Sequence, residues 1–159
     1  MNANEKIIIR ENKILKLTNV LIREIKEHEV DKIPQIYYLV DNYVKAKKNS
    51  IVGPMINYSR TVINHSGQAE VKLELMVQLK EPFEEEDEYR FRPMIRVENC
   101  LFARFVERED KLQYAYQKLG VYAFENDIDL KDDCYTVFVK KENENVAVDI
   151  FIQVKDKSQ

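Results

Sequence analysis

The sequence predicts an α+β fold, a duplicated β-α-β-β unit with pseudo-twofold symmetry, in which a largely antiparallel sheet carries two main helices on one face. Three observations lead to this expectation. Residues 13–29 are echoed by residues 93–109, eighty positions later. Residues 71–79 are echoed by residues 146–154, at an offset of seventy-five. Between these segments the apolar pattern changes from the two-residue period of strands to helical spacing, in the same order in both halves.

In both matches, residues of similar chemical type are aligned. Leu21 aligns with Leu101 in the first match, and Glu74 aligns with Asp149 in the second. Strand composition alone could produce two short matches of this kind, because similar residues recur in all strands. The shared order and spacing of the segments favour a duplication, which would leave a cleft between the halves.

The first half begins as a strand followed by a helix. Residues 13–28 alternate as a long strand with a bulge near Asn19, after a short strand at residues 7–9. A helix is expected at about residues 32–48, with Pro34 in its first turn. Its apolar residues fall at helical spacing, at Ile33, Ile36, Tyr37, Val40 and Val44.

A hairpin completes the first half. Its expected arms are residues 51–63 and 69–79, joined by a turn at 64–67. The next segment holds the only dense charge run of the chain, so residues 81–91 are expected to form an acidic, solvated connector. The same run could instead serve as a binding segment.

The second half repeats this order, within a single domain at residues 1–159. We expect a strand at 92–108, a helix capped by Asp110, and strands at 133–141 and 145–155 around a turn at 142–145. The helix has apolar residues at Leu112, Ala115, Tyr116, Leu119, Tyr122 and Ala123. The half-repeats are therefore placed at about 13–80 and 92–155.

Composition narrows the class of protein. The chain has 159 residues, of which 45% are hydrophobic and 33% are charged, and it contains only three glycines and four prolines. These values are typical of an ordered globular domain. A formal charge of −3 makes nucleic acid a poor partner. The N-terminus lacks a signal-peptide pattern and no apolar run could span a bilayer, so we expect a cytoplasmic protein with no membrane insertion.

Metal, cofactor and catalytic signatures are weak. His28 and His65 lack ligand spacing, and Cys100 and Cys134 are interpreted as reduced core residues. The three glycines are isolated, which excludes a phosphate-binding loop, and no nucleophile elbow occurs. We therefore expect no cofactor, no metal and no enzymatic activity.

An acidic residue inside the last strand of each half is the main candidate for a binding site. A partly buried carboxylate beside aromatic rings attracts a cation. The candidate cleft residues are Asp149, Glu74, Tyr37, Tyr58, Tyr116, Tyr135 and Phe138. Alternatively, both carboxylates occupy the solvent face of their strands, and the helical aromatics belong to the core. Tyr38 and Tyr114 fall off the apolar stripes and are candidates for partner binding.

The doubled β-α-β-β order, with Glu74 and Asp149 inside the last strands, resembles the GyrI-like effector-binding domains over residues 13–155. That family is also found fused to AraC-type and MerR-type regulators. The resemblance implies a pocket between the halves, in which the position of Asp149 would receive a cationic or drug-like ligand. The chain departs from the family by having Gln78 and Gln153 where a Pro-containing tail is common. Some relatives are hydrolases that use a pocket carboxylate, which would again be Asp149.

The segment Gly53-Pro-Met-Ile-Asn-Tyr-Ser59 is similar to one in a small Gram-positive family encoded beside LXG polymorphic toxins of the type seven secretion system. That resemblance implies an immunity or accessory protein with a cognate protein partner, which is the function we expect. The alternative is a small-molecule domain that senses or sequesters a cationic or aromatic ligand in an acidic, aromatic cleft.

Overall fold

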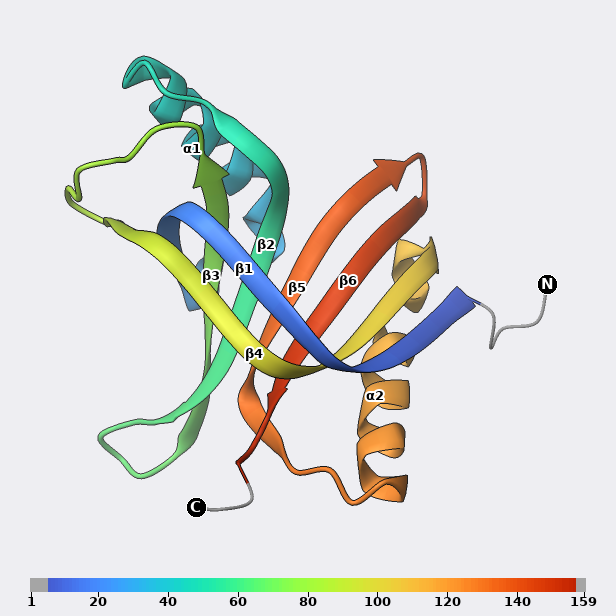
Figure 1. Cartoon of the computed structure of the whole chain (residues 1–159). Coiled ribbons are helices and arrows are strands. Elements are labelled where there is room, and N and C mark those ends of the chain that lie inside the picture. The colour runs from blue at the N-terminus through green and yellow to red at the C-terminus, as the bar shows by residue number, and fades with distance from the viewer. Residues whose placement is uncertain (1–5, 157–159) are drawn as a thin grey trace. The chain divides into compact units, whose positions relative to one another are not determined.

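The protein's structure, a computed structural model, describes residues 6–156. The strands and helices follow the order β-α-β-β twice along the chain (Figure 1). Their bounds are β1 (Ile7–Ile25), α1 (Ile33–Ala46), β2 (Ile51–Ile63), β3 (Ala69–Leu79), β4 (Tyr89–Arg108), α2 (Gln113–Glu125), β5 (Leu130–Glu142) and β6 (Asn145–Val154). A short 3-10 helix precedes each α-helix, at Glu27–Lys32 and at Glu109–Lys111. The predicted α+β class, the two helices and the antiparallel pairing are confirmed.

The chain divides into two compact units. The middle unit comprises residues 16–96, and the terminal unit combines the N-terminal segment up to Leu15 with the chain from Val97 onward. The long strands β1 and β4 each contribute residues to both units. The acidic segment 81–88 lies wholly inside the middle unit.

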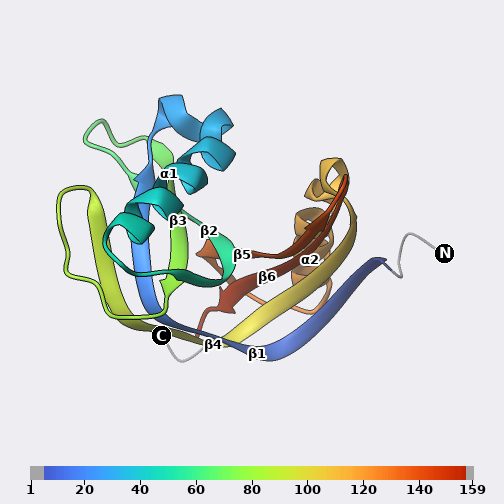
Figure 2. The same ribbon diagram turned by 90° about the horizontal axis from the view of Figure 1, so that it is seen from above.

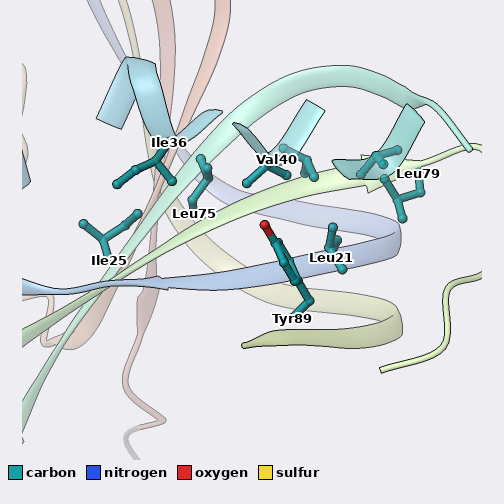
Figure 3. Packing of buried hydrophobic residues seen from close by; sticks show 9 residues of the cluster. Leu21, Ile25, Ile36, Val40, Leu75, Leu79 and Tyr89 are labelled. Carbon is teal, nitrogen blue, oxygen red and sulfur yellow. The ribbon is translucent and has the colours of Figure 1, made fainter. Parts of the chain in front are cut away.

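In the middle unit, β3 pairs antiparallel with both β1 and β2, and α1 packs on one face of these strands (Figure 2). The helix contributes Ile36, Val40 and Val44, which are spaced four residues apart and so lie on one side. Figure 3 shows the side chain of Leu75 between those of Ile36 and Val40, with Leu21 nearby on the adjacent strand. The buried members of this core are Leu21, Ile25, Ile36, Val40, Val44, Leu75, Val77, Leu79 and Tyr89.

In the terminal unit, β6 pairs antiparallel with both β4 and β5, and α2 packs on one face. The helix residues that reach the core are Ala115, Leu119 and Ala123, again four residues apart. The buried strand residues of this core are Leu101, Ala103, Phe105, Val146, Val148 and Ile150.

The strand registers of the two units correspond. Leu21 lies opposite Val77 in the middle unit, and Leu101 lies opposite Ile152 in the terminal unit. These are the residues that the sequence offsets of eighty and seventy-five align. Both hairpins also slip near the start of their first arm, between Val52 and Ile56 in β2 and between Leu130 and Cys134 in β5, and the second hairpin slips again between Phe138 and Lys140.

A glutamine fixes each long strand at the same position. Asn19 and Asn99 have left-handed backbone, with φ of 50° and 53°, so each strand is irregular there. The backbone N–H of Thr18 donates to Gln78 Oε1 at 2.9 Å, and Gln153 Nε2 donates to the Glu98 carbonyl at 3.0 Å. Gln78 and Gln153 therefore stabilise the irregular turns of the backbone in both units.

Some boundaries differ from the sequence-based expectations. Residues 7–25 form one strand, rather than a short strand followed by a longer one. The prediction that Asp110 caps the second helix is wrong, because Asp110 lies within the 3-10 helix and accepts a hydrogen bond from Arg108 at 3.0 Å. The strand β4 begins at Tyr89, inside the expected connector, since Tyr89 is buried and stacks on Tyr43 at a centroid distance of 4.1 Å.

Neither α-helix of the described chain has the combination of length and apolarity that is needed to cross a membrane.

The core packing of α1 predicts different costs for two apolar positions on the same helix. Ile36 is 3% exposed and Leu39 is 60% exposed. We expect Ile36→Ala to lower the free energy of unfolding by about 2–5 kcal/mol, because it leaves a cavity beneath the helix. Leu39→Ala should change it by less than about 0.5 kcal/mol. Urea denaturation of both variants measures this difference, and equal losses would contradict the packing described.

Candidate functional site

The candidate site lies on the face of the terminal sheet that α2 does not cover. Val148 and Ile150 of β6 pack toward α2. Because side chains alternate along a strand, Asp149 and Phe151 point to the opposite face. On β4, the same alternation places Phe102 on this face, directly opposite Phe151. We call this surface the helix-free face.

Asp149 is the buried acidic group of this face, with 8% exposure. Arg104 lies directly opposite on β4, and its guanidinium binds the carboxylate in a fork: Nε to Oδ1 at 2.8 Å and the terminal nitrogen to Oδ2 at 2.8 Å. These hydrogen bonds and the negative charge raise the pKa of Arg104 above its ordinary value. Both carboxylate oxygens are thus engaged by a charged donor, which is a strong geometry for an ion pair.

Three aromatic residues lie on the same face as this ion pair. The rings of Phe102 and Phe151 meet edge to face, with centroids 5.1 Å apart. Tyr135 of β5 is buried and lies opposite Phe151 on the other side of β6. Two cations lie over the Phe102 ring: Lys13 Nζ is 5.1 Å and Arg104 Cζ is 5.9 Å from its centroid. The face therefore combines a carboxylate, three aromatic rings and cations in cation–π contact.

The middle unit carries a related but different arrangement. Glu74 is 9% exposed, and its cross-strand neighbours are Tyr58 on β2 and Glu24 on β1. Two carboxylates that face each other across a strand pair repel. Glu74 is instead paired with Arg90. The position opposite the carboxylate is therefore Glu24 in one unit and Arg104 in the other.

Other candidates lie on the helix side of their sheets. Tyr116 of α2 shares a hydrogen bond with Thr136, with the two oxygens 2.6 Å apart, and desolvation raises the pKa of Tyr116 to about 12. Phe138 packs against the core beneath α2, and Tyr37 packs against the core beneath α1. Asp149 and Tyr135 therefore share the helix-free face of the terminal unit. Tyr116, Phe138 and Tyr37 lie instead on the side of the sheet that a helix covers.

The two candidates for partner binding are on the outer surfaces of the helices. Tyr38 of α1 is 66% exposed, and Tyr114 of α2 is 51% exposed. Neither residue contributes to the buried cores.

Three residues of the helix-free face were not among the sequence-based candidates: Phe102, Arg104 and Phe151. The offset of eighty already aligns Glu24 with Arg104, so the sequence contains the charge reversal. The alternation along residues 149–151 likewise places Phe151 beside Asp149. Identifying these residues also requires the register between β4 and β6, which cannot be read from a single sequence.

The part of the chain that the structure describes holds no group of three or more His, Cys, Asp or Glu residues that could bind a metal ion. Cys100 and Cys134 are free, and burial raises the pKa of each thiol to about 11. Thiols with raised pKa values are poor nucleophiles at neutral pH. Their environment suits packing rather than chemistry.

A separate groove of about 550 Å³ opens on the middle unit beside the ends of β1 and β3. Its walls carry charges of both signs, and Lys72 lies 3.9 Å from Glu24 and 3.8 Å from Glu70. Asp149 does not line this groove. The groove is therefore separate from the ion pair of the helix-free face.

No family model matches the chain, and no curated protein matches it. Solved structures do resemble it. EcmrR, solved in a complex with DNA, has a TM-score of 0.66 and 14% identity over 95% of this chain. A hydrolase from Listeria innocua has a TM-score of 0.53 and 7% identity, covering 94% of this chain and 92% of its own. SAV2435 bound to tetraphenylphosphonium has a TM-score of 0.50 and 12% identity, covering 92% of this chain and 94% of its own.

At these identities the likeness shows the fold alone. The chain spans 58% of the EcmrR chain, which is less than two thirds of it. The resemblance extends over nearly the whole of the other two chains.

The ion pair of the site predicts a stability effect that depends on which partner is removed. Arg104→Ala leaves the buried Asp149 carboxylate without its fork of donors, so we expect the free energy of unfolding to fall by about 1–3 kcal/mol. Asp149→Asn added to Arg104→Ala should recover part of this loss, because a neutral amide is cheaper to bury. Urea denaturation of the single and double variants provides the test. A double variant less stable than Arg104→Ala would contradict this account of the pair.

Proposed function

We propose that the protein is a GyrI-like ligand-binding domain that takes a hydrophobic cation on the helix-free face of its terminal unit. One observation carries the proposal: the face already holds a cation of the protein itself. The guanidinium of Arg104 is bound to Asp149 and lies over the Phe102 ring. A ligand cation that entered this place would replace Arg104.

The physical argument rests on partial burial. Asp149 is almost fully shielded from water, so its attraction for a cation is screened less than at an open surface. Phe102, Phe151 and Tyr135 lie on the same face as this carboxylate and are themselves buried, so its surroundings are largely apolar. Arg104 can leave without a large rearrangement of the fold, because its side chain is 52% exposed. A hydrophobic cation that carries aromatic rings would gain both the cation–π contacts and the apolar contacts.

The structural neighbours support this choice. SAV2435 was solved with tetraphenylphosphonium, which is a hydrophobic cation, and EcmrR was solved with DNA. The corresponding registers of the two units support a duplicated GyrI-like domain with half-repeats at about 13–80 and 92–155. The positions of Asp149 and Glu74 correspond within it.

The comparisons offer no support for a partner from a toxin locus. The Gly53-Pro54 segment that suggested such a partner also has a local structural reason. Gly53 has φ of +81°, and it lies where the pairing of β2 with β3 slips between Val52 and Ile56. A residue with positive φ at a bulge is commonly glycine. The backbone geometry at this bulge therefore accounts for the glycine without a protein partner.

A binding role is also favoured over a catalytic one. One structural neighbour is a hydrolase, but in this chain the two oxygens of Asp149 bind a guanidinium, which is a partner that a ligand cation can replace. We assign Asp149 the role of an electrostatic contact for the ligand.

Titration with tetraphenylphosphonium by isothermal calorimetry tests the proposal. We expect Asp149→Asn to weaken binding about tenfold or more, which corresponds to about 1.4 kcal/mol. Arg104→Gln should strengthen binding, because it removes the internal cation that competes for Asp149. Tetraphenylphosphonium should also raise the melting temperature of Arg104→Gln, even if the substitution lowers stability, since a ligand that binds the folded state stabilises it.

Glu74→Gln provides the matched control, because Glu74 occupies the corresponding position of the middle unit. It should leave the affinity unchanged within about twofold. The proposal is wrong if Glu74→Gln abolishes binding while Asp149→Asn does not. It is also wrong if the unaltered protein does not bind tetraphenylphosphonium and Arg104→Gln does not bind it either.

A further inference from the structure

The outer face of α2 is apolar and uncovered in the described chain. Tyr114, Val121 and Phe124 are 51%, 55% and 85% exposed. Together with Gln117 they repeat at intervals of three, four and three residues, so they form one stripe along the helix. This stripe lies opposite the residues that pack on the sheet, Ala115, Leu119 and Ala123. We call it the α2 stripe.

The first helix provides an internal comparison. The core residues of α1 are Ile36, Val40 and Val44, and those of α2 are Ala115, Leu119 and Ala123, so the helices correspond with an offset of seventy-nine. The positions of α1 that correspond to the α2 stripe are Gln35, Tyr38, Asn42 and Lys45. The last of these forms an ion pair with Asp41 at 2.9 Å. At these four positions α1 thus has three polar residues and Tyr38, whereas α2 has Gln117 and three aromatic or apolar residues.

Gly120 is a second, independent observation on this helix. It corresponds to Asp41 of α1 and borders the α2 stripe. A glycine inside a helix is unfavourable compared with alanine. Nothing lies within 4 Å of the place where a Cβ would be, so no neighbour in the described structure requires a glycine. A second helix that packs closely on this face would require one.

We propose that the α2 stripe is the interface with a second copy of this chain, with the two α2 helices antiparallel about a twofold axis. In this arrangement Tyr114 lies beside Phe124 of the second copy, and Gln117 lies beside Val121 of the second copy. The intervals of the stripe are those of helices that cross at about 20°. Each contact is made twice because of the symmetry.

The charges at the helix ends fit an antiparallel pair. Lys111 lies just before α2, and Glu125 and Asp127 lie at and beyond its end. The two acidic residues at the start, Glu109 and Asp110, are paired with Lys141 at 3.2 Å and Arg108 at 3.0 Å. The antiparallel arrangement therefore brings Lys111 near the acidic end of the second helix, and it aligns the helix dipoles favourably.

The charges around the α2 stripe also favour a second copy of the chain over a lipid surface as its partner. Helices that lie on lipid surfaces carry Lys and Arg along their polar face. The α2 stripe is bordered by only one lysine within the helix, Lys118, whose ammonium group donates to the Ile7 carbonyl at 3.0 Å. A second copy supplies charges of both signs at the correct ends, which a lipid surface does not.

A single helix of 13 residues offers less surface than a standard stable interface. We therefore expect a weak dimer that forms at high micromolar concentration. Sedimentation equilibrium of the full chain, from about 5 to 500 µM, should show a reversible monomer–dimer equilibrium. A protein that remains monomeric over this range would overturn the proposal.

Two substitutions test the interface separately from folding. Phe124→Glu places a charge at the most exposed residue of the stripe, and it should weaken dimerisation at least tenfold. Gly120→Leu should weaken it similarly by blocking close approach, while the melting temperature of the monomer stays the same or rises because leucine favours helix. A dimer that persists in both variants has its interface elsewhere, and the proposal fails.

Leu39→Glu is the matched control, because Leu39 is an exposed apolar residue on the outer face of α1. It should leave the dimerisation constant unchanged. Lys111→Glu should weaken the dimer, and combining it with Asp127→Lys should restore it if the helices are antiparallel. Failure of this charge exchange to restore dimerisation would exclude the antiparallel arrangement.

Discussion

The antiparallel register between β4 and β6 is the constraint on which the terminal unit depends. It places Leu101, Ala103 and Phe105 under α2, and it sets Arg104 directly opposite Asp149 on the other face. A shift by one residue would exchange the two faces, because side chains alternate along a strand. Asp149 would then enter the apolar core, and Ile150 would leave it. The hydrophobic core and the ion pair therefore enforce the same register.

Gln153 reinforces this register at the point where β4 becomes irregular. Asn99 has left-handed backbone, and the side chain of Gln153 reaches the carbonyl of the preceding residue, Glu98. Gln78 makes the corresponding contact beside Asn19 in the middle unit. The two glutamines, which looked like losses of a family feature, thus have a definite structural role. A glutamine side chain therefore binds the backbone beside the irregular residue in both units, accepting from an N–H group in one and donating to a carbonyl in the other.

The sequence predicted the order of the elements well, because strand and helix periods differ and the two halves repeat them. It predicted the faces of individual residues less well. Tyr135 and Phe138 are three positions apart on one strand, so alternation already assigns them to opposite faces. The Arg104–Asp149 pair requires the register across two strands that are distant in sequence. The Asp110 cap failed because Arg108 competes for the carboxylate.

The differences between the corresponding positions are more informative than the similarities. The shared residues maintain the cores, whereas Glu24 and Arg104 reverse the charge opposite the buried carboxylate. The outer faces of the helices also differ, since the charged Lys45 of α1 corresponds to the apolar Phe124 of α2. In the terminal unit, the cross-strand neighbour of the carboxylate is therefore a cation on one face of the sheet, and the helix on the other face has an apolar outer stripe. Packing of the hydrophobic core explains neither difference, because the side chains that differ are exposed. We therefore interpret both differences as features of binding surfaces.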